Sequence, residues 1–230
     1  MNPILIFDYD GTLQETLSIY EPAVRRIREL LIAQGYLPPN PGRERIESWL
    51  GMRTDEMWKD FMPELPAEQA AYYGKKIGAE MLHAIEAGHA AWYPCIVHQL
   101  EALKQCGFRM LVLSNCGNAY AEAVWKRFHM ERYFTEFIPC ERYGNLSKAD
   151  VLELIIGERK FGLPIMIGDR ANDLEAARRI DCPMIGCGYG YGTAAELQGC
   201  DCYIRTPEEL TSAVLGRLSE LQNRSKLRKV

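Results

Sequence analysis

The sequence of 230 residues contains eight cysteines, but no two of them have the CxxC spacing of redox and zinc motifs. Its four histidines form no HExxH motif and no other paired spacing of a zinc enzyme. Ser114 does not lie in the GxSxG setting of a hydrolase nucleophile. These absences argue against a disulfide scaffold, zinc catalysis and a serine hydrolase, and they favour cysteines that stay reduced.

The sequence also lacks an excess of positive charge and any long apolar run. Its formal net charge is −4, so it has no basic field to attract nucleic acid or an anionic membrane. No apolar run approaches the roughly 20 residues that span a bilayer, and the N-terminus does not resemble a signal peptide. We therefore expect a cytoplasmic protein that binds neither nucleic acid nor membrane.

Short apolar runs recur along the chain and end in polar residues or glycine. Such runs are typical of strands that are buried on both faces, as in parallel sheets. We expect strands at residues 3–7, 109–113, 163–167, 183–185 and 203–204. Helical patterns follow at residues 96–105, 119–128, 149–158 and 172–180. This alternation predicts an α/β fold with a doubly wound, mainly parallel, Rossmann-like sheet.

Residues 15–90 break the alternation because they contain no convincing strand. Their helical patterns, the first at 21–34 with Pro22 in its first turn, are separated by glycines and prolines. A loop of this length is implausible in a compact domain, so we interpret the segment as a helical insertion. The predicted organisation is a core of residues 1–14 and 91–230 with an inserted helical domain of residues 15–90.

The first predicted strand ends in the acidic segment Asp8-Tyr9-Asp10-Gly11-Thr12. Open parallel sheets bind ligands at the carboxyl ends of their strands, where Asp8 and Asp10 are placed. Two carboxylates in one cleft repel each other, so they need a cation or a shared proton. The alternative is that Asp8 caps a helix and that Asp10 and Gly11 form only a turn.

A second acidic segment follows the strand predicted at 163–167. Asp169 stands at the strand end, and Asp173, one helical turn later, can face the same side if the helix has begun by then. Together with Asp8 they form an all-oxygen set that suits Mg²⁺. The alternative is that Asp169 and Asn172 are helix caps.

Two further segments are suited to binding an anion. Ser114 and Asn115 follow the strand at 109–113, where a hydroxyl, an amide and backbone N–H groups meet. Lys148 precedes the helix at 149–158 and places a compact positive charge near the same sheet edge. Taken alone, these residues could equally be helix caps and a surface lysine.

In their order along the chain, these segments resemble the four motifs of the haloacid dehalogenase (HAD) superfamily: DxDGT, a strand-end Ser or Thr, a Lys, and GDxxxD. The Tyr93-Pro94 pair and the segments 188–192 and 206–210 are similar to phosphoglycolate-phosphatase-like members. The insertion at 15–90 occupies the position of that family's helical cap. One departure is Cys95, because glycine is common after the Tyr-Pro pair.

The resemblance implies a phosphoric monoester hydrolase that acts on a small phosphorylated metabolite. Asp8 would be the nucleophile that forms an aspartyl-phosphate, and Asp10 would be the general acid and base. Mg²⁺ would be held by the Asp8 carboxylate, the Asp10 backbone carbonyl and the Asp169 carboxylate, with Asp173 in or beside the metal shell. The transferring phosphoryl group would be bound by Ser114, Asn115 and Lys148.

Asp10 argues against dehalogenation, because a halide leaves without a proton. Arg53 lies in the cap loop where phosphonatases are expected to use a lysine, and we consider it a candidate for binding a second anionic group on the substrate. An exposed arginine at a helix start is an equal alternative. A phosphonate or sugar-phosphate enzyme of the same superfamily therefore stays open.

Two alternatives come from other functional classes. The first is a catalytically weak regulatory protein that binds a phosphometabolite, and the second is a partner-binding protein that uses the aromatic cap. The presence of both Asp8 and Asp10 favours an enzyme, because a binder could lose either residue at little cost to folding. We expect a monomer or a homodimer.

Overall fold

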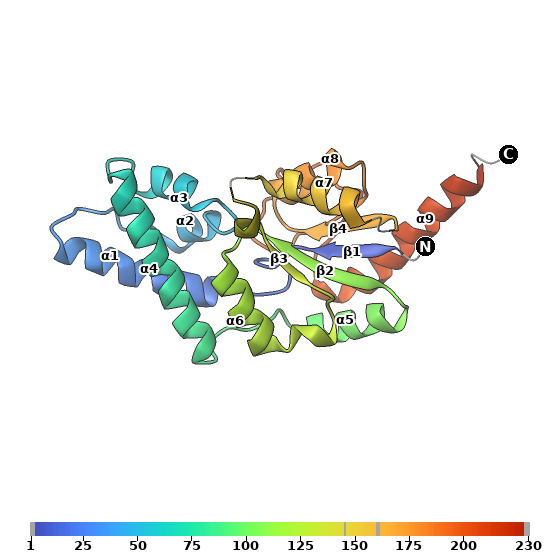
Figure 1. Cartoon of the computed structure of the whole chain (residues 1–230), viewed down its shortest axis with the longest axis horizontal. Coiled ribbons are helices and arrows are strands. Elements are labelled where there is room, and N and C mark those ends of the chain that lie inside the picture. The colour runs from blue at the N-terminus through green and yellow to red at the C-terminus, as the bar shows by residue number, and fades with distance from the viewer. Residues whose placement is uncertain (1–2, 145, 160–161, 228–230) are drawn as a thin grey trace.

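The computed structural model describes residues 3–144, 146–159 and 162–227, and the core of the protein is one six-stranded parallel sheet (Figure 1). The strand order is β3-β2-β1-β4-β5-β6. The strands are β1 (Ile4–Phe7), β2 (Arg109–Ser114), β3 (Phe137–Pro139), β4 (Pro164–Gly168), β5 (Met184–Cys187) and β6 (Cys202–Ile204). The prediction of an α/β fold with a parallel, Rossmann-like sheet is confirmed.

Strand β1 is apolar at every position because helices cover both faces of the sheet. Leu5 and Phe7 belong to the core cluster under α5 (Ile96–Gln105), α6 (Asn118–Phe128) and α9 (Leu210–Leu227). Ile4 and Ile6 face the opposite way, into the cluster under α7 (Lys148–Arg159) and α8 (Ala171–Arg179). Alternate residues of a strand point to opposite faces, so a strand between two helical layers is apolar throughout.

Two details differ from the sequence predictions. Strand β3 was not expected, because its three residues, which include a proline, are too short to form a recognisable apolar run. The first helix of the insertion begins at Leu17 rather than at Glu21, so Pro22 lies inside the helix and not in its first turn. Burial of Leu17, Ile19 and Tyr20 explains the earlier start, since packing of this turn offsets the missing N–H of the proline.

Residues 15–90 form four helices and no strand: α1 (Leu17–Ala33), α2 (Arg43–Ser48), α3 (Thr54–Phe61) and α4 (Ala67–Glu86). Figure 1 shows them together at one end of the molecule, beyond the carboxyl ends of the strands, and we call them the cap. Their aromatic residues pack into a buried cluster of the cap itself. The boundaries at residues 15 and 90 stay a prediction.

The chain passes between the core and the cap at two adjacent segments. The backbone N–H of Glu15 donates to the carbonyl of Ala91 over 3.1 Å, and that of Tyr93 donates to Leu13 over 2.9 Å. The end of β1 is thus tied to the segment that follows α4. Within the described part of the chain, no helix is long and apolar enough to cross a membrane.

Candidate active site

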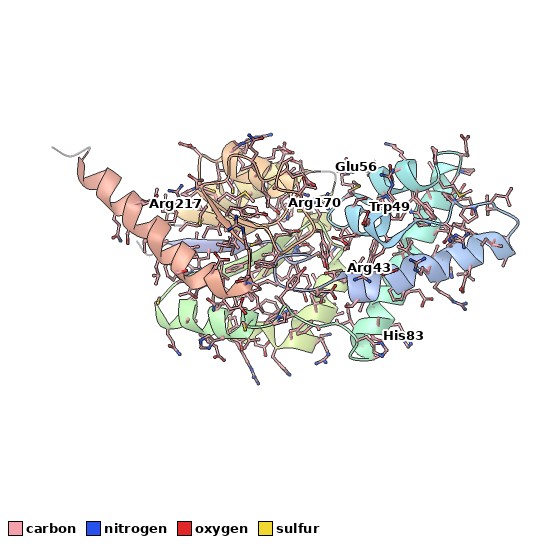
Figure 2. All side chains as sticks on the ribbon, turned by 180° about the vertical axis from the view of Figure 1, so that it is seen from behind. Arg43, Trp49, Glu56, His83, Arg170 and Arg217 are labelled. Carbon is pink, nitrogen blue, oxygen red and sulfur yellow. The ribbon has the colours of Figure 1, made fainter. Side chains whose placement is uncertain are left out.

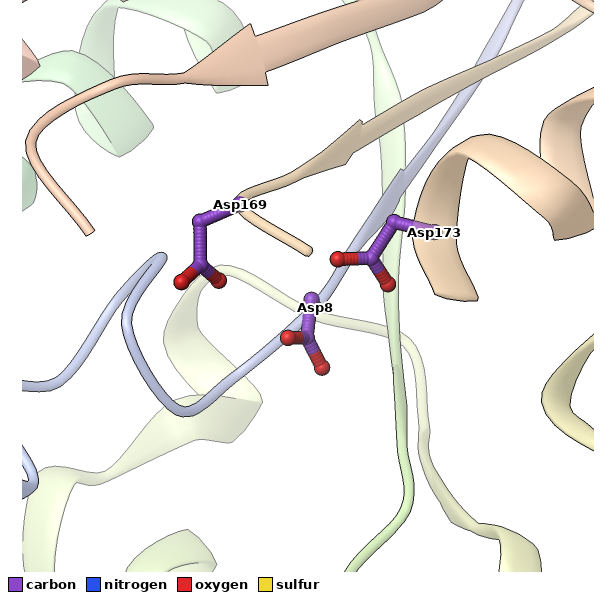
Figure 3. A group of neighbouring side chains, drawn as sticks. All are labelled: Asp8, Asp169 and Asp173. Atoms are coloured by element: carbon purple, nitrogen blue, oxygen red, sulfur yellow. The ribbon is translucent and has the colours of Figure 1, made fainter. Parts of the chain in front are cut away.

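The carboxyl ends of β1 and β4 bring three carboxylates together. The strands are parallel neighbours with Phe7 opposite Ile167. Asp8 and Asp169 therefore lie just beyond the carboxyl ends of two neighbouring strands. Asp173 joins them from the first turn of α8. One oxygen from each carboxylate lies within 4.8 Å of the others, and all three residues are buried (Figure 3).

Lys148, the first residue of α7, is buried against this acidic cluster. Its Nζ lies 2.6 Å from Asp8 Oδ1 and 2.7 Å from Asp173 Oδ1. Burial raises the pKa of Asp8 well above its ordinary value; Asp173 adds to this rise, and Lys148 opposes it. Burial, and then Asp173, raise the pKa of Asp169 to about 7. One positive charge does not balance three buried carboxylates, so the cluster has room electrostatically for a further cation.

Hydrogen bonds fix the orientation of Asp169 and Asp173. Thr12 Oγ1 donates to Asp169 Oδ1 over 3.0 Å, and the backbone N–H of Tyr191 donates to Oδ2 over 2.8 Å. Asp173 Oδ2 accepts from the backbone N–H of Arg170 over 3.0 Å. Arg170 is the N-cap residue of α8, so the alternative in which Asp169 or Asn172 caps this helix is wrong.

Gly11 allows the first loop to pass close to these carboxylates. Its φ is +87°, in the left-handed region, and a Cβ at this position would collide with the Asp169 carboxylate. The alternative, in which Asp10 and Gly11 form only a turn, does not account for this close approach of Gly11 to the acidic cluster.

Asp10 lies beside this cluster and accepts two hydrogen bonds on one oxygen. The hydroxyls of Thr16 and Tyr120 each donate to Asp10 Oδ1 over 2.7 Å. Burial raises the pKa of Asp10, whereas the two hydrogen bonds from Thr16 and Tyr120 lower it, with a net rise. Because Oδ1 accepts from two donors, Oδ2 is the oxygen that is free to take a proton when Asp10 is protonated.

A buried chain of hydrogen bonds sets the direction of both donors. Trp92 Nε1, which can only donate, points to the hydroxyl of Tyr9 at 3.3 Å, and that hydroxyl donates to Gln14 Oε1 over 2.8 Å. Gln14 Nε2 then donates to Tyr120 over 2.8 Å and to Thr16 over 3.1 Å. Each of these two hydroxyls accepts from the amide, so each is left to donate its own proton to Asp10.

Two cavities open where the core meets the cap. The smaller, here called the inner cavity, has a volume of about 190 Å³. On the core side it is lined by five of the predicted site residues, namely Asp8, Asp10, Ser114, Asn115 and Lys148. The larger, or outer, cavity has a volume of about 840 Å³ and shares Asn115 and Lys148 with it, but Asp8 and Asp10 line only the inner one.

Core side chains hold the cap loop at Gly51, which lines both cavities. The carbonyl of Gly51 accepts from Asn115 Nδ2 over 3.3 Å and from Asn172 Nδ2 over 3.1 Å. The guanidinium of Arg170 donates to the carbonyl of Leu50 and, through Nε, to Glu196 Oε2 over 3.0 Å. Figure 2 shows Arg170 on the core side of this junction.

Arg53 is placed differently from the other predicted site residues. It lines the outer cavity, its side chain is 48% exposed, and its Nε lies 3.2 Å from Asp55 Oδ1. The structure therefore brings seven predicted residues to one end of the sheet and leaves Arg53 at the outer opening. Its role in binding a second anionic group stays a prediction.

Sequence reasoning missed the residues that position Asp10. Thr16, Gln14 and Tyr120 were not singled out as site residues, although Gln14 and Thr16 follow the DxDGT segment directly. The polar pair could have been found from its position beside the motif. No sequence signal distinguishes Tyr120 as a site residue, because an aromatic residue near a helix start is more often part of a core.

Comparisons with known proteins identify the family and agree with the fold. A profile of the family described as haloacid dehalogenase-like hydrolase matches residues 5–187. The chain is similar to phosphoglycolate phosphatases from Thiobacillus denitrificans (26% identity, 92% of this chain and 94% of the relative) and Agrobacterium fabrum (28%, 83% and 82%). The crystal structure of a predicted phosphatase from Clostridium acetobutylicum superposes with a TM-score of 0.77 at 23% identity, covering 94% of this chain and 98% of that one.

Proposed function

Since the chain belongs to the haloacid dehalogenase-like hydrolase family, we propose that it is a Mg²⁺-dependent phosphatase that hydrolyses small phosphate monoesters through an aspartyl-phosphate on Asp8. The phosphoglycolate phosphatase relatives support the phosphatase activity. The observation that carries the proposal is that Asp8 and Asp10 line one cavity together with Ser114, Asn115 and Lys148.

The donor set at the end of β1 and β4 fits Mg²⁺. It consists of buried carboxylate oxygens, the ligands that this hard cation prefers. The single positive charge of Lys148 balances only part of their negative charge. The metal would be held by Asp8, the backbone carbonyl of Asp10 and Asp169, with Asp173 in or beside its shell. When bound, Mg²⁺ would neutralise negative charge on the oxygens of the transferring phosphoryl group.

The two aspartates of the first loop divide the chemistry. An Asp8 oxygen attacks phosphorus, the bond from phosphorus to the ester oxygen breaks, and Asp10 gives its Oδ2 proton to the departing oxygen, which leaves as an alcohol. Water then attacks the aspartyl-phosphate and passes a proton to Asp10, which releases inorganic phosphate and restores both side chains. The raised pKa of Asp10 suits a group that must first hold this proton.

Three residues at neighbouring strand and helix ends suit the phosphoryl group. Ser114 ends β2, next to β1 in the sheet, and Asn115 follows it directly. Lys148 brings a positive charge held by ion pairs to Asp8 and Asp173. Phosphoryl transfer depends mainly on positioning and charge neutralisation, which a hydroxyl, an amide and an ammonium group provide together.

The test is release of phosphate from p-nitrophenyl phosphate with and without Mg²⁺, for the unmodified protein and for Asp8→Asn. We expect turnover only with Mg²⁺ and its loss in Asp8→Asn by roughly a thousandfold or more, as for other nucleophile removals. Asp181→Asn is the matched control, because Asp181 is an exposed aspartate outside the site. Its activity is expected to be unchanged.

Asp8→Asn that retains full activity would overturn the proposed nucleophile. Absence of turnover across a panel of phosphorylated metabolites, combined with binding of Mg²⁺ and phosphate, would instead identify a regulatory binding protein. Detection of a phosphorylated aspartate at Asp8 by rapid quenching and mass spectrometry tests the intermediate separately from the overall rate.

A further inference from the structure

The inner cavity has two chemically distinct halves, and we propose that its cap half selects phosphate esters of uncharged, mainly apolar alcohols. This inference rests on the proposed phosphatase function and names the substrate class of that same site. The core half carries the charged groups Asp8, Asp10 and Lys148. The cap half is lined by Tyr20, Trp49, Leu50, Gly51, Met52, Thr54, Met57, Gly74, Ile77, Gly78 and Met81.

The leaving group must enter the inner cavity rather than the outer one. Asp10 has to reach the departing oxygen to protonate it, and it lines only the inner cavity. The alcohol part of the substrate therefore faces the cap half of this space. Apolar and sulfur-containing side chains there, such as Trp49, Met57 and Ile77, favour an apolar group in this position.

An anionic leaving group finds no cation in this half of the cavity. Among the described residues that line the inner cavity, Lys148 carries its only side-chain positive charge, and it is committed to Asp8 and Asp173. A carboxylate placed against Met57 and Ile77 would lose its hydration without gaining a positively charged partner. Phosphoglycolate, for which the relatives are named, carries such a carboxylate directly on its ester carbon.

Four charged side chains of the cap line the outer cavity instead. Arg53 and Lys59 line it together with Asp55 and Glu56, and Asp55 lies within ion-pair distance of both cations. These residues line the larger of the two cavities. The leaving group that Asp10 protonates lies in the inner cavity, in contact with uncharged residues of the cap.

The closing experiment compares two esters of the same shape. Isobutyl phosphate and 2-phosphoglycolate share one heavy-atom skeleton, but the first ends in two methyl groups and the second in a carboxylate. With Mg²⁺ present, we expect kcat/KM to be at least tenfold higher for isobutyl phosphate. The proposal is overturned by an equal or higher value for 2-phosphoglycolate, and Arg53→Gln then shows whether Arg53 binds the carboxylate.

A cavity-filling variant locates the selective contact. Gly78 lies inside α4 and lines the inner cavity, and a Cβ added there meets no atom within 4 Å, so Gly78→Leu extends into free space. We expect it to lower kcat/KM for isobutyl phosphate at least tenfold while that for methyl phosphate stays within twofold. Gly157→Leu, at an exposed helical glycine with equal space, is the matched control.

The converse variant adds the missing cation. Met52 lines the cap half and is 37% exposed, so Met52→Arg introduces a charge without burying it fully. We expect the ratio of kcat/KM for 2-phosphoglycolate to that for isobutyl phosphate to rise at least tenfold. The proposal is contradicted if Gly78→Leu leaves the ratio of kcat/KM for isobutyl phosphate to that for methyl phosphate unchanged and Met52→Arg leaves the ratio for 2-phosphoglycolate to isobutyl phosphate unchanged. Such results would show that the cap half does not contact the leaving group.

The outcomes separate this inference from the proposed function. If p-nitrophenyl phosphate is hydrolysed with Mg²⁺ and 2-phosphoglycolate is the better of the two esters, the phosphatase proposal stands and the selectivity proposal fails. If no ester, aryl or alkyl, is hydrolysed, the phosphatase proposal fails and the selectivity proposal fails with it.

Discussion

The hydroxyl of Tyr120 donates a hydrogen bond of 2.7 Å to Asp10 Oδ1, although 110 residues separate the two in the sequence. Tyr120 lies in the first turn of α6, on the face buried against the sheet. Gln14 donates to the same hydroxyl over 2.8 Å, so the tyrosine proton is directed at the carboxylate. Tyr120 is thus a positioning residue for the group proposed as general acid.

Tyr120→Phe tests this relationship. One hydrogen bond to a charged group contributes about 1.5–3 kcal/mol, so we expect kcat to fall tenfold or more with little change in KM. The bond lowers the pKa of Asp10, so its loss raises that pKa and moves the basic limb of the kcat profile to higher pH. Tyr203→Phe, at an exposed tyrosine of β6, is the control. A basic limb that does not move would contradict this role.

The cap loop at Gly51 gives a second prediction. Its carbonyl accepts from Asn115 and Asn172, and removal of one donor by Asn172→Ala weakens the docking of the loop on the core. We expect faster amide hydrogen exchange in residues 50–54 and a KM several times higher, with kcat changed less than threefold. Asn40→Ala, at an exposed asparagine of the cap, should alter neither quantity. Unchanged exchange in Asn172→Ala would show that these bonds do not hold the loop.

The sequence was sufficient for most of the sheet and for the acidic cluster. Each of the strands β1, β2 and β4 is an apolar run that ends at a candidate site residue, and neighbouring parallel strands place those residues at one edge. The cluster of Asp8, Asp169 and Asp173 follows from that topology. The same reasoning placed Lys148 close to this edge, where the structure buries it.

What the sequence could not predict depends on tertiary contacts. The chain of hydrogen bonds runs from Trp92 through Tyr9 and Gln14 to the two hydroxyls that donate to Asp10. It joins segments whose side-chain directions are set only by packing. The short strand β3 is defined by its pairing with β2 and not by its own composition. The apolar cap half of the inner cavity likewise combines residues of α1, α3 and α4 that are far apart in the chain.

Stabilisation by Mg²⁺ should depend on pH. The pKa of Asp169 rises from 3.8 to about 7 on folding, so between these values the folded protein binds more protons than the unfolded chain. Stability without metal therefore falls as pH increases through this window, whereas Mg²⁺ binding, which requires the carboxylate, becomes tighter. Each tenfold gain in affinity adds about 1.4 kcal/mol, or roughly 3–6 °C in Tm.

The measurement is Tm with EDTA and with a fixed excess of Mg²⁺, between about pH 5 and pH 8. We expect the difference between the two Tm values to grow as pH rises. Asp169→Asn removes this metal-binding carboxylate together with its titration, so its Tm difference should be small and change less with pH. An equal difference at both ends of the range in the unmodified protein would show that Asp169 is already ionised at the lower pH.

Cys95 gives a prediction about stability alone. It follows the Tyr93-Pro94 pair, and its φ of +64° places a residue with a side chain in the left-handed region. This conformation costs about 1–2 kcal/mol, and the greater freedom of glycine in the unfolded chain offsets about 0.5–1 kcal/mol of the relief. Cys95→Gly should therefore be more stable than Cys95→Ala by about 0.5–1 kcal/mol, or roughly 1–4 °C in Tm. Both variants lose the same contact of the thiol with Glu208, so their difference isolates the Cβ atom. If Cys95→Ala proves equally stable or more stable by urea unfolding, the left-handed conformation carries no strain at this position.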